Sequence, residues 1–426
     1  MRQPYKVALA ARVLCWSVLC WSTGQAVAQE RPFYFTSPID LQTGWESGVP
    51  NGNMRLNVPA TILTLPTFSL LHDSPRNQFT LSYDPQFEMF TSPHRLDSFN
   101  QNGTLQWVSD LSPRWSLSVN DVFTGTRDEG QRFETTFLLP LGQYNENGLY
   151  TSLNYKFTDR TYVKFRYENA FVDYNAINLS RPLFFSRMGN TGGLTVDHHF
   201  TSRLKVSGSY SYLRTTAFDK YDDMGNLILP FAPTQFTVGT VSYNATPSLL
   251  FEVTGGYVHN PANSYLVGGL VEKHLQHMTV AGGYNRYLTF VGAPSALGVE
   301  LPVNDIAGRA LPPNSISNTV SFRASGMISD HWGVEMNVLA SRTAGETDFT
   351  TLRSAMGGVR LNYRISDHLT AFVNADLYRQ NANVILPIPI SRSRFFAGIA
   401  YTFSPSPDEI ARRREAARSG LKPETK

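Results

Sequence analysis

The sequence predicts an all-β fold: a transmembrane, antiparallel, up-and-down β-barrel of about 18 strands, with about 16 as the lower count. Three observations lead to this prediction. Segments of about ten residues alternate between apolar and polar side chains, which is the length that a tilted strand needs to cross a bilayer. Tight turns recur at one end of the hairpins. Long connections join the strands at the other end, as is typical of periplasmic turns and extracellular loops.

The clearest hairpin spans Met356–Tyr378. In its first arm Val359 and Leu361 point to one side, while Arg360 and Asn362 point to the other. The second arm repeats this period of two after a Ser-Asp turn. A single hairpin of a water-soluble sandwich would show the same alternation, so the choice between the two depends on the whole chain.

Composition favours extensive β structure. The 426 residues include 31 Gly, 20 Tyr and 27 Phe, and only 17% are charged. The formal net charge of +3 is too small to indicate a nucleic-acid partner. No stretch after residue 28 approaches the length of an apolar spanning helix. For an exported chain that still crosses a membrane, a closed β-barrel is the remaining solution.

The first residues are typical of an export signal. Arg2 and Lys6 precede the short apolar run Val7–Val18, and Ala26–Ala28 form a small-residue cleavage site. A single membrane anchor is the less favoured alternative, because the run is short and contains an arginine. Both cysteines lie in this segment. The predicted organisation is an export signal at 1–28, a periplasmic N-terminal segment at 29–38, an outer-membrane barrel at 39–405 and a basic periplasmic tail at 406–426.

The tight turns share one pattern: a hydrophobic residue, then Ser or Thr, then Asp, Pro or Ser, and usually a basic residue. The segments that match it are Leu111–Arg114, Phe157–Arg160, Phe200–Arg203, Ala245–Ser248, Ile328–His331 and Ile365–His368, with looser matches at His72–Arg76 and Lys273–His277.

Alternation is weaker in two places. It blurs at Phe236–Tyr243, where we expect a bulge. Pro66 interrupts the segment Thr61–Leu71. The first strand, near Asp40–Trp45, and the second, near Ile62–Leu71, are the two that separate the higher strand count from the lower. Either count is even and places both ends of the barrel in the periplasm.

The chain resembles outer-membrane porin-like β-barrels associated with exopolysaccharide export. The segments that carry the resemblance are Leu111–Phe123, the closing strand Phe395–Phe403 and the periodic turns. The resemblance spans nearly all of the mature chain. It implies an outer-membrane location, contact with outer-membrane lipid, and a polysaccharide and a periplasmic export protein as partners. One departure is that residues 404–426 follow the closing aromatic residue Phe403.

That tail contains a helix-start pattern at Ser406–Glu409, with Pro at the first helical position and four arginines before Gly420. These features favour a short helix. A solvated basic segment is one interpretation of it. Docking to a periplasmic partner or to an acidic glycan is the other.

We expect the polar faces of the strands to line the barrel interior. In one interpretation these residues keep the lumen wet and pair across strands. In the other, Arg360, Arg364 and Arg394 together attract an anionic polymer, and Phe372 and Tyr378 stack on sugar rings. The predicted lumen-lining residues are Lys164, Arg166, Glu168, Arg323, Glu335, Arg360, Asn362, Arg364, Phe372, Asp376, Tyr378 and Arg394.

Three of the long connections carry similar apolar motifs, Phe137–Leu141, Leu227–Phe231 and Val384–Ile388. Apolar segments rarely stay exposed at loop tips. One hypothesis is that they fold inward and gate the mouth of the barrel. The other is that each lies on the rim. The residues of this predicted gate are Leu139, Pro140, Leu229, Pro230, Leu386 and Pro387.

The sequence predicts neither a catalytic site nor a metal site, and no cofactor. His198–His199 and His72–Ser74 are the nearest to a catalytic set, but neighbouring strand residues face opposite ways, and the second group sits in a turn. Asp222–Asp223 is an isolated acidic pair.

Three functions remain open from the sequence. Export of an extracellular polysaccharide is the first interpretation. A general diffusion porin for small solutes is the second, and a non-conducting surface-anchoring or adhesion barrel is the third. The sequence leaves the oligomeric state open.

Overall fold

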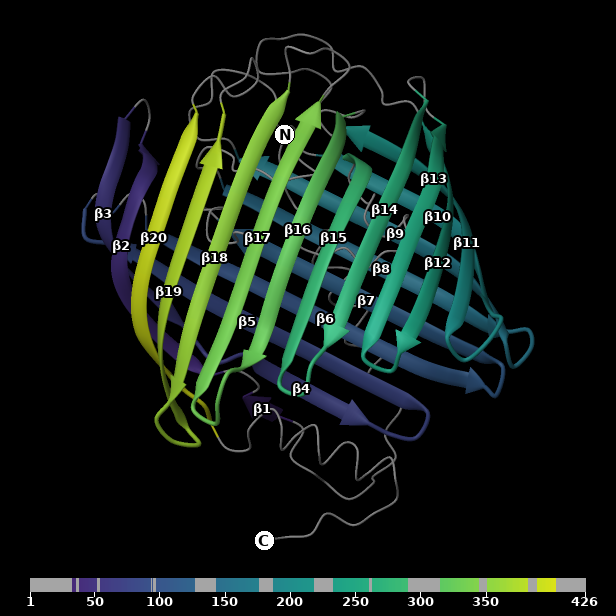
Figure 1. Cartoon of the computed structure of the whole chain (residues 1–426), viewed down its shortest axis with the longest axis horizontal. Coiled ribbons are helices and arrows are strands. Elements are labelled where there is room, and N and C mark those ends of the chain that lie inside the picture. Colours follow the sequence, from purple (N-terminus) through teal and green to yellow (C-terminus); the bar gives the residue numbers. More distant parts are fainter. Residues whose placement is uncertain are drawn as a thin grey trace, which may run out of the picture.

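The computed structural model describes residues 33–35, 38–51, 54–92, 94, 97–126, 143–175, 187–217, 233–259, 263–289, 315–344, 351–381 and 389–403. All of its elements are strands, wound into one sheet (Figure 1). Within these residues no helix is long and apolar enough to span a bilayer. The strands are β1 (Phe33–Phe35), β2 (Ile39–Asn51), β3 (Met54–Thr64), β4 (Phe68–Asp73), β5 (Asn77–Phe90), β6 (Ser98–Ser112), β7 (Trp115–Thr126), β8 (Gln143–Lys156), β9 (Thr161–Asn175), β10 (Arg187–His199), β11 (Leu204–Ala217), β12 (Thr234–Thr246), β13 (Leu249–His259), β14 (Ser264–His274), β15 (Met278–Thr289), β16 (Ser315–Met327), β17 (Trp332–Ala344), β18 (Leu352–Arg364), β19 (Leu369–Gln380) and β20 (Ile390–Tyr401).

The sheet closes on itself through β2 and β20. Ile39 pairs with Tyr401, and the antiparallel ladder continues to Ser47 and Ser393. β3 and β4 both pair with β5, so they are two parts of one wall strand, and β1 extends the position of β2 by pairing with β4. The described strands therefore occupy 18 positions in a closed antiparallel barrel, which confirms the predicted fold and the higher strand count.

The turns explain the predicted sequence pattern. Each of the eight predicted segments connects two neighbouring strands at the same end of the barrel. The side chain of the Ser or Thr closes the turn: Ser366 Oγ accepts hydrogen bonds from the backbone N–H groups of His368 and Leu369, at 3.3 and 3.1 Å. Thr201 does the same for Arg203 and Leu204. The turns satisfy their own backbone groups and can therefore be short.

Two predicted irregularities have different outcomes. The break at Pro66 is confirmed, since it lies between β3 and β4. The bulge at Phe236–Tyr243 is wrong, because those residues pair in unbroken register with both neighbouring strands, and the shift lies between Asn244 and Thr246. The alternation blurred there because Phe236 and Val238 are apolar residues on the inner face, packed in a buried cluster.

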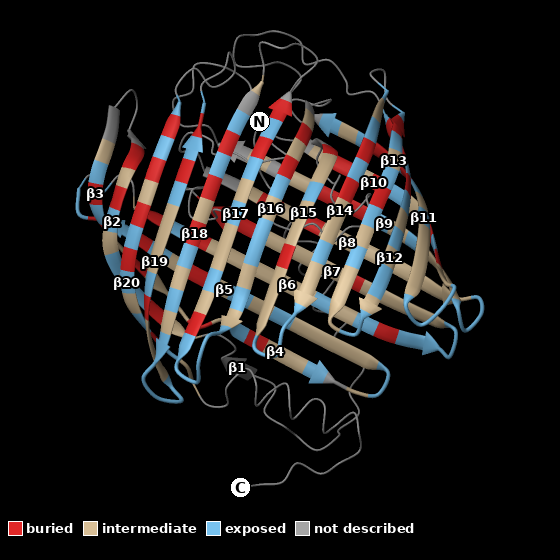
Figure 2. Cartoon of the chain, viewed as in Figure 1, coloured by how far each residue is buried: buried red, intermediate tan, exposed pale blue. Residues whose placement is uncertain are grey.

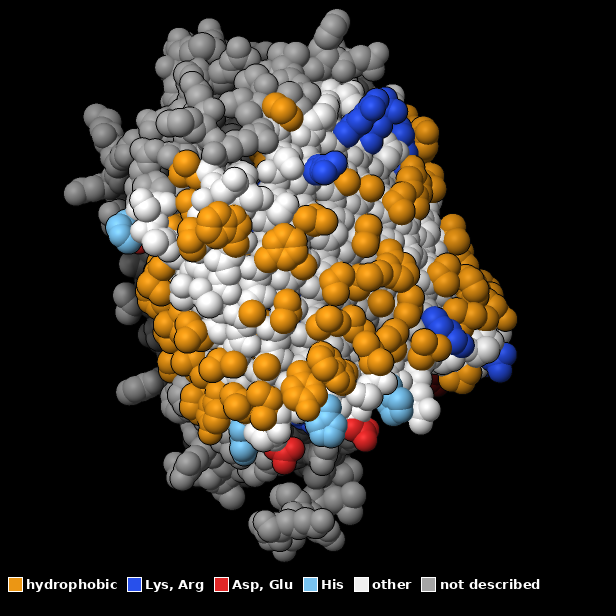
Figure 3. Space-filling view, turned by 60° about the vertical axis from the view of Figure 1, so that its left-hand side comes forward, with side chains coloured by type: hydrophobic (Ala, Val, Ile, Leu, Met, Phe, Trp, Pro, Cys, Tyr) orange, Lys and Arg blue, Asp and Glu red, His pale blue; other side chains and the backbone are white. Residues whose placement is uncertain are grey.

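The two faces of the wall differ as the alternation requires. Directly paired residues share a face, and Leu361 and Val373, which pair across β18 and β19, are 40% and 55% exposed. Phe372, the neighbour of Val373 on the opposite face, is 3% exposed. Exposed and buried residues alternate along the strands in Figure 2. Figure 3 shows the apolar side chains that cover the outer wall.

Aromatic residues gather on the outer wall beside the turns. Trp332 packs against Tyr363 with ring centroids 4.9 Å apart, and Trp115 packs against Tyr155 at 4.5 Å. Aromatic rings are favoured where hydrocarbon meets headgroups, so these pairs mark one edge of the membrane-spanning band.

Glycine permits close approach at the closing seam. A Cβ on Gly44 would lie 1.9 Å from the carbonyl oxygen of Phe395 on β20. Gly48 has φ of 76° at the register shift between Ser47 and Val49. A side chain at either position would push β2 away from β20 or strain its backbone.

Candidate functional site: the polar interior of the barrel

The interior presents the polar faces of the strands. All twelve residues predicted to line the lumen lie on the inner face of the wall, where the register pairs them with other inward residues. The structure does not bring them to one place. They form a buried cluster at the closing seam, a polar recess between β7 and β11, and exposed pairs nearer the turns.

The seam cluster joins two arginines to two carboxylates. Arg394 lies 2.7 Å from Glu88 through Nη2 and 3.3 Å from Glu46 through Nε. Arg392 forms an ion pair with the other oxygen of Glu46. The four side chains are at most 4% exposed. Because β2 and β3 separate β20 from β5, the contact with Glu88 reaches across the inner surface of neighbouring strands.

Sequence reasoning missed Arg392, Glu46 and Glu88. The signal that could have found Glu46 is the row Leu41, Thr43 and Trp45, which faces outward and leaves Glu46 inward. Glu88 follows the same alternation on β5, where Phe87 and Met89 face outward on either side of it.

A second arginine group lies beside the cluster. Arg360 Nη2 is 3.4 Å from Asp40 Oδ2, and its guanidinium lies 3.9 Å from the centre of the Phe372 ring. Asp376 lies directly opposite Arg394 in the register and accepts a hydrogen bond of 2.7 Å from Asn374.

Two predictions about this region are wrong. Arg360, Arg364 and Arg394 do not form one cationic surface, because Arg364 donates instead to the carbonyl of Asp330 in a turn, and the others face carboxylates. Phe372 and Tyr378 do not offer open faces to sugar rings, since they are 3% and 1% exposed. Arg360 covers the first ring.

Charged residues nearer the turns are more exposed. Lys164 and Lys205 lie 2.7 and 3.5 Å from Asp197. Arg323, whose side chain is 68% exposed, lies 3.4 Å from Glu272. These pairs carry both signs of charge. Glu335 also faces this region and accepts a hydrogen bond of 3.3 Å from Asn362.

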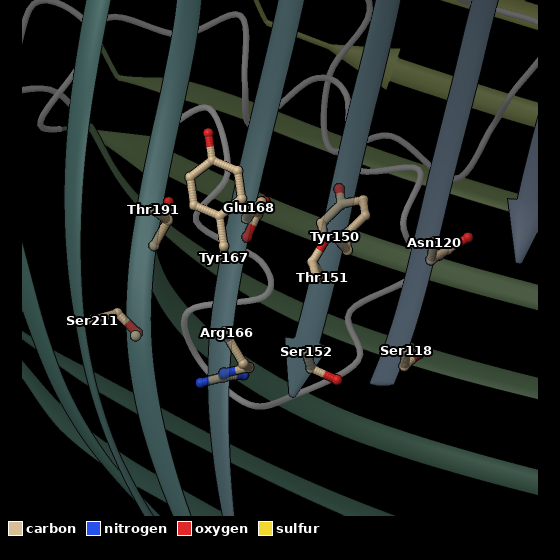
Figure 4. A pocket seen from close by; sticks show the side chains of 11 residues that line it. Ser118, Asn120, Tyr150, Thr151, Ser152, Arg166, Tyr167, Glu168, Thr191 and Ser211 are labelled. Carbon is tan, nitrogen blue, oxygen red and sulfur yellow. The ribbon is translucent and has the colours of Figure 1, made fainter. Parts of the chain in front are cut away.

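A recess of about 130 Å³ opens between β7 and β11 (Figure 4). Two neighbouring rows of inward residues form it, and Gly193 lies directly opposite Arg166. Glu168 is 4% exposed, and neither of its carboxylate oxygens has a hydrogen-bond partner among the described residues. The first row is Asn120, Tyr150, Glu168 and Thr191; the second is Ser118, Ser152, Arg166, Gly193 and Ser211.

On β11–β15 the inner face becomes apolar toward the long connections. Leu213, Phe236, Val258 and Tyr287 belong to one buried cluster on β11–β15. Inward residues at this end of other strands are also buried, whereas those near the turns are more open. The predicted gate residues Leu139, Pro140, Leu229, Pro230, Leu386 and Pro387 lie outside the described residues, as do the export signal and residues 404–426.

The histidine candidates have local partners. His198 Nδ1 lies 3.0 Å from Thr161 Oγ1 on the paired strand. Ser74 closes its turn by donating to the carbonyl oxygen of Asn77 and accepting from its N–H group. These contacts do not bring a nucleophile and a base together.

Among known proteins, only solved structures match this chain, and they do so at low sequence identity. No protein-family model and no curated protein sequence matches the chain. Among solved structures, OccAB4 of Acinetobacter baumannii aligns at 12% identity and a TM-score of 0.43, over 85% of this chain and 97% of that one. OccK5 (OpdH) of Pseudomonas aeruginosa aligns at 13% identity and a TM-score of 0.44, over 86% of this chain and 99% of that one. OpdO of Pseudomonas aeruginosa aligns at 12% identity and a TM-score of 0.44, over 86% of this chain and 97% of that one.

A closed sheet with an apolar outer face, an aromatic edge and a polar inner face satisfies every requirement of a membrane-spanning barrel. The chain therefore forms a membrane-spanning β-barrel.

Proposed function

We propose that the protein is a passive channel that lets small polar solutes cross the outer membrane. The observation that carries this proposal is the inner face of the 18-position wall, which is polar and charged along the strands near the turns. A barrel of this size has room for an aqueous lumen. Carboxylates and basic residues alternate on that face and pair with one another, which favours weak selectivity between small solutes.

Export of a polysaccharide is the function implied by the sequence resemblance, and it has less support in the described interior. A polymer conduit needs open aromatic faces or free charges along its path. Phe372 and Tyr378 are buried, and Arg360 and Arg394 face carboxylates. A non-conducting anchoring barrel has no specific support either, because such a barrel does not need a charged inner face.

The second part of the proposal is that the lumen is narrow at the end nearest the long connections. Apolar residues inside an aqueous lumen are unfavourable unless other apolar groups cover them. The inner cluster around Phe236 and Val258 provides a surface of this kind. We propose that the three apolar motifs in the long connections gate the mouth by packing against this surface.

Conductance tests the channel. Purified protein in a planar bilayer is expected to give steady, stepwise ion currents, and liposomes that contain it should swell in small sugars or amino acids but not in large dextrans. A folded barrel that gives neither current nor swelling would contradict passive diffusion and favour a closed exporter or an anchor. Loss of extracellular polymer on gene deletion, with unchanged solute uptake, would favour export.

Thiol labelling tests the gate. Single cysteines at Leu139, Leu229 and Leu386 are expected to react with a water-soluble maleimide at least about tenfold more slowly than a cysteine at the exposed turn residue Asp367. The expected cause is burial of the motifs against the inner apolar cluster. Rapid labelling at all three positions, with unchanged conductance, would contradict the gate and leave the channel proposal intact.

A further inference from the structure

Three neighbouring strands end their outward apolar rows in an arginine. On β17 the outward residues Val334, Met336, Val338 and Ala340 precede Arg342, and on β18 the row from Tyr363 to Ala355 precedes Arg353. On β19 the row from Ala371 to Leu377 precedes Arg379. All three arginines are exposed. They lie at the end of the barrel opposite the turns, where Figure 3 shows basic side chains above the apolar surface.

The height of the three arginines matches the far edge of the membrane-spanning band. From Trp332, in the aromatic pairs beside the turns, to Arg342 the strand rises about 33 Å at about 3.3 Å per residue. At a strand tilt of about 40°, this is about 25 Å along the barrel axis. The apolar band of such barrels is about 25 Å tall, so the guanidinium groups lie at the level of lipid headgroups.

The three arginines are close to one another, and none has an acidic partner among the described residues. Arg342 and Arg353 are directly opposite in the register of β17 and β18. Arg379 pairs with Ala355, two residues along β18 from Arg353. No ion pair involves any of the three side chains in the described part of the chain. Like charges placed directly opposite each other destabilise a sheet unless an anion lies between them.

Arg286 provides a contrast on the same outer surface. Its guanidinium lies 4.2 Å from the centre of the Tyr265 ring, and its Nη1 donates to Asn318 at 3.2 Å. This arginine finds its partners within the wall. The described part of the wall offers no such partner to the side chains of Arg342, Arg353 and Arg379, which lie on its membrane-facing surface.

We propose that Arg342, Arg353 and Arg379 form a binding site for the phosphate-bearing headgroup of an outer-leaflet lipid. Guanidinium groups bind phosphate through paired, charge-assisted hydrogen bonds, and three of them on adjacent strands can surround one phosphate group. The site faces away from the lumen, so the inference does not depend on the channel. A lipid is the source of the phosphate because the headgroup lies at this height while its acyl chains lie along the apolar rows beneath.

Lipid binding to the folded, detergent-solubilised barrel tests this site. Native mass spectrometry would follow titration with dioctanoyl phosphatidic acid, with dioctanoyl phosphatidylcholine and with inorganic phosphate. The wild type is expected to bind phosphatidic acid at least about tenfold more tightly than phosphatidylcholine. The variant R342Q/R353Q/R379Q is expected to lose about 10- to 100-fold of that affinity, since each basic residue near the headgroup contributes about fivefold.

The matched control is R114Q/R160Q/R203Q, which removes three exposed arginines from the turns and changes the net charge equally. This control is expected to bind phosphatidic acid as the wild type does. Equal losses in both triple variants, or no loss in either, would overturn the proposal. If inorganic phosphate at the same concentration displaced phosphatidic acid, the site would bind a free anion and not a lipid, and this result would also overturn the proposal. If the first triple variant does not fold, R353Q alone is expected to weaken binding about fivefold, and an unchanged affinity would overturn the site.

Discussion

Replacing Arg394 with alanine is expected to destabilise the folded barrel by about 3–5 kcal/mol, the usual consequence of removing one partner from a buried ion pair. The substitution leaves Glu88 without its 2.7 Å contact and removes one of the two arginines beside Glu46. Both carboxylates are fully buried, so water cannot replace the lost guanidinium. Urea unfolding in detergent, followed by tryptophan fluorescence, measures the change.

Arg323→Ala is the control for this prediction. Arg323 also faces the interior and lies 3.4 Å from Glu272, but its side chain is 68% exposed. Its loss is expected to cost at most about 1 kcal/mol, because solvent screens exposed pairs. Similar losses in the two variants would show that the seam cluster is not buried as described.

Placing lysine at Val373 is expected to cost about 2–4 kcal/mol of folding free energy in a lipid bilayer, the range for a basic residue near the midplane of a barrel's lipid-facing wall. Val373 is 55% exposed on the outer face, in the middle of its apolar row. Unfolding by guanidinium in lipid vesicles would measure the loss.

The adjacent substitution Asn374→Lys is the matched control. Asn374 faces the interior, where it lies 2.7 Å from Asp376 and directly opposite Arg360, so a lysine there has one acidic and one basic neighbour. A change of less than about 1 kcal/mol is expected, because exposed and half-exposed charges on the polar side interact weakly. If Asn374→Lys is as costly as Val373→Lys, the two faces do not have the environments assigned to them.

The sequence could predict the barrel because alternation and turn chemistry repeat along the chain. The outward and inward faces can be assigned residue by residue in Val359–Arg364 and Leu369–Leu377. Ser366 closes its turn as the pattern implies. The same reasoning failed at Phe236. This apolar residue faces inward, so the alternation is lost there and a bulge was predicted although the register is unbroken. Alternation describes the polarity of a face, and it misleads wherever the interior itself is apolar.

The organisation of the interior could be predicted only in part. Inward positions such as Arg360 and Arg394 follow from the period of two. Their partners do not, because Asp40 and Glu88 are far away in the sequence and on other wall strands. Closure of the sheet determines these contacts. Local sequence patterns do not predict how the first and last strands pair when the sheet closes.

Cysteine accessibility along one strand tests the central claim most directly: that the apolar face of the wall meets lipid and the polar face meets water. The chain has no cysteine after Cys20. Single cysteines at Val359, Leu361 and Tyr363, and at Arg360, Asn362 and Arg364, would be exposed to a charged thiol reagent in lipid vesicles. We expect fast labelling at the second set and slow labelling at the first. Uniform labelling across both sets, or the reverse alternation, would contradict it.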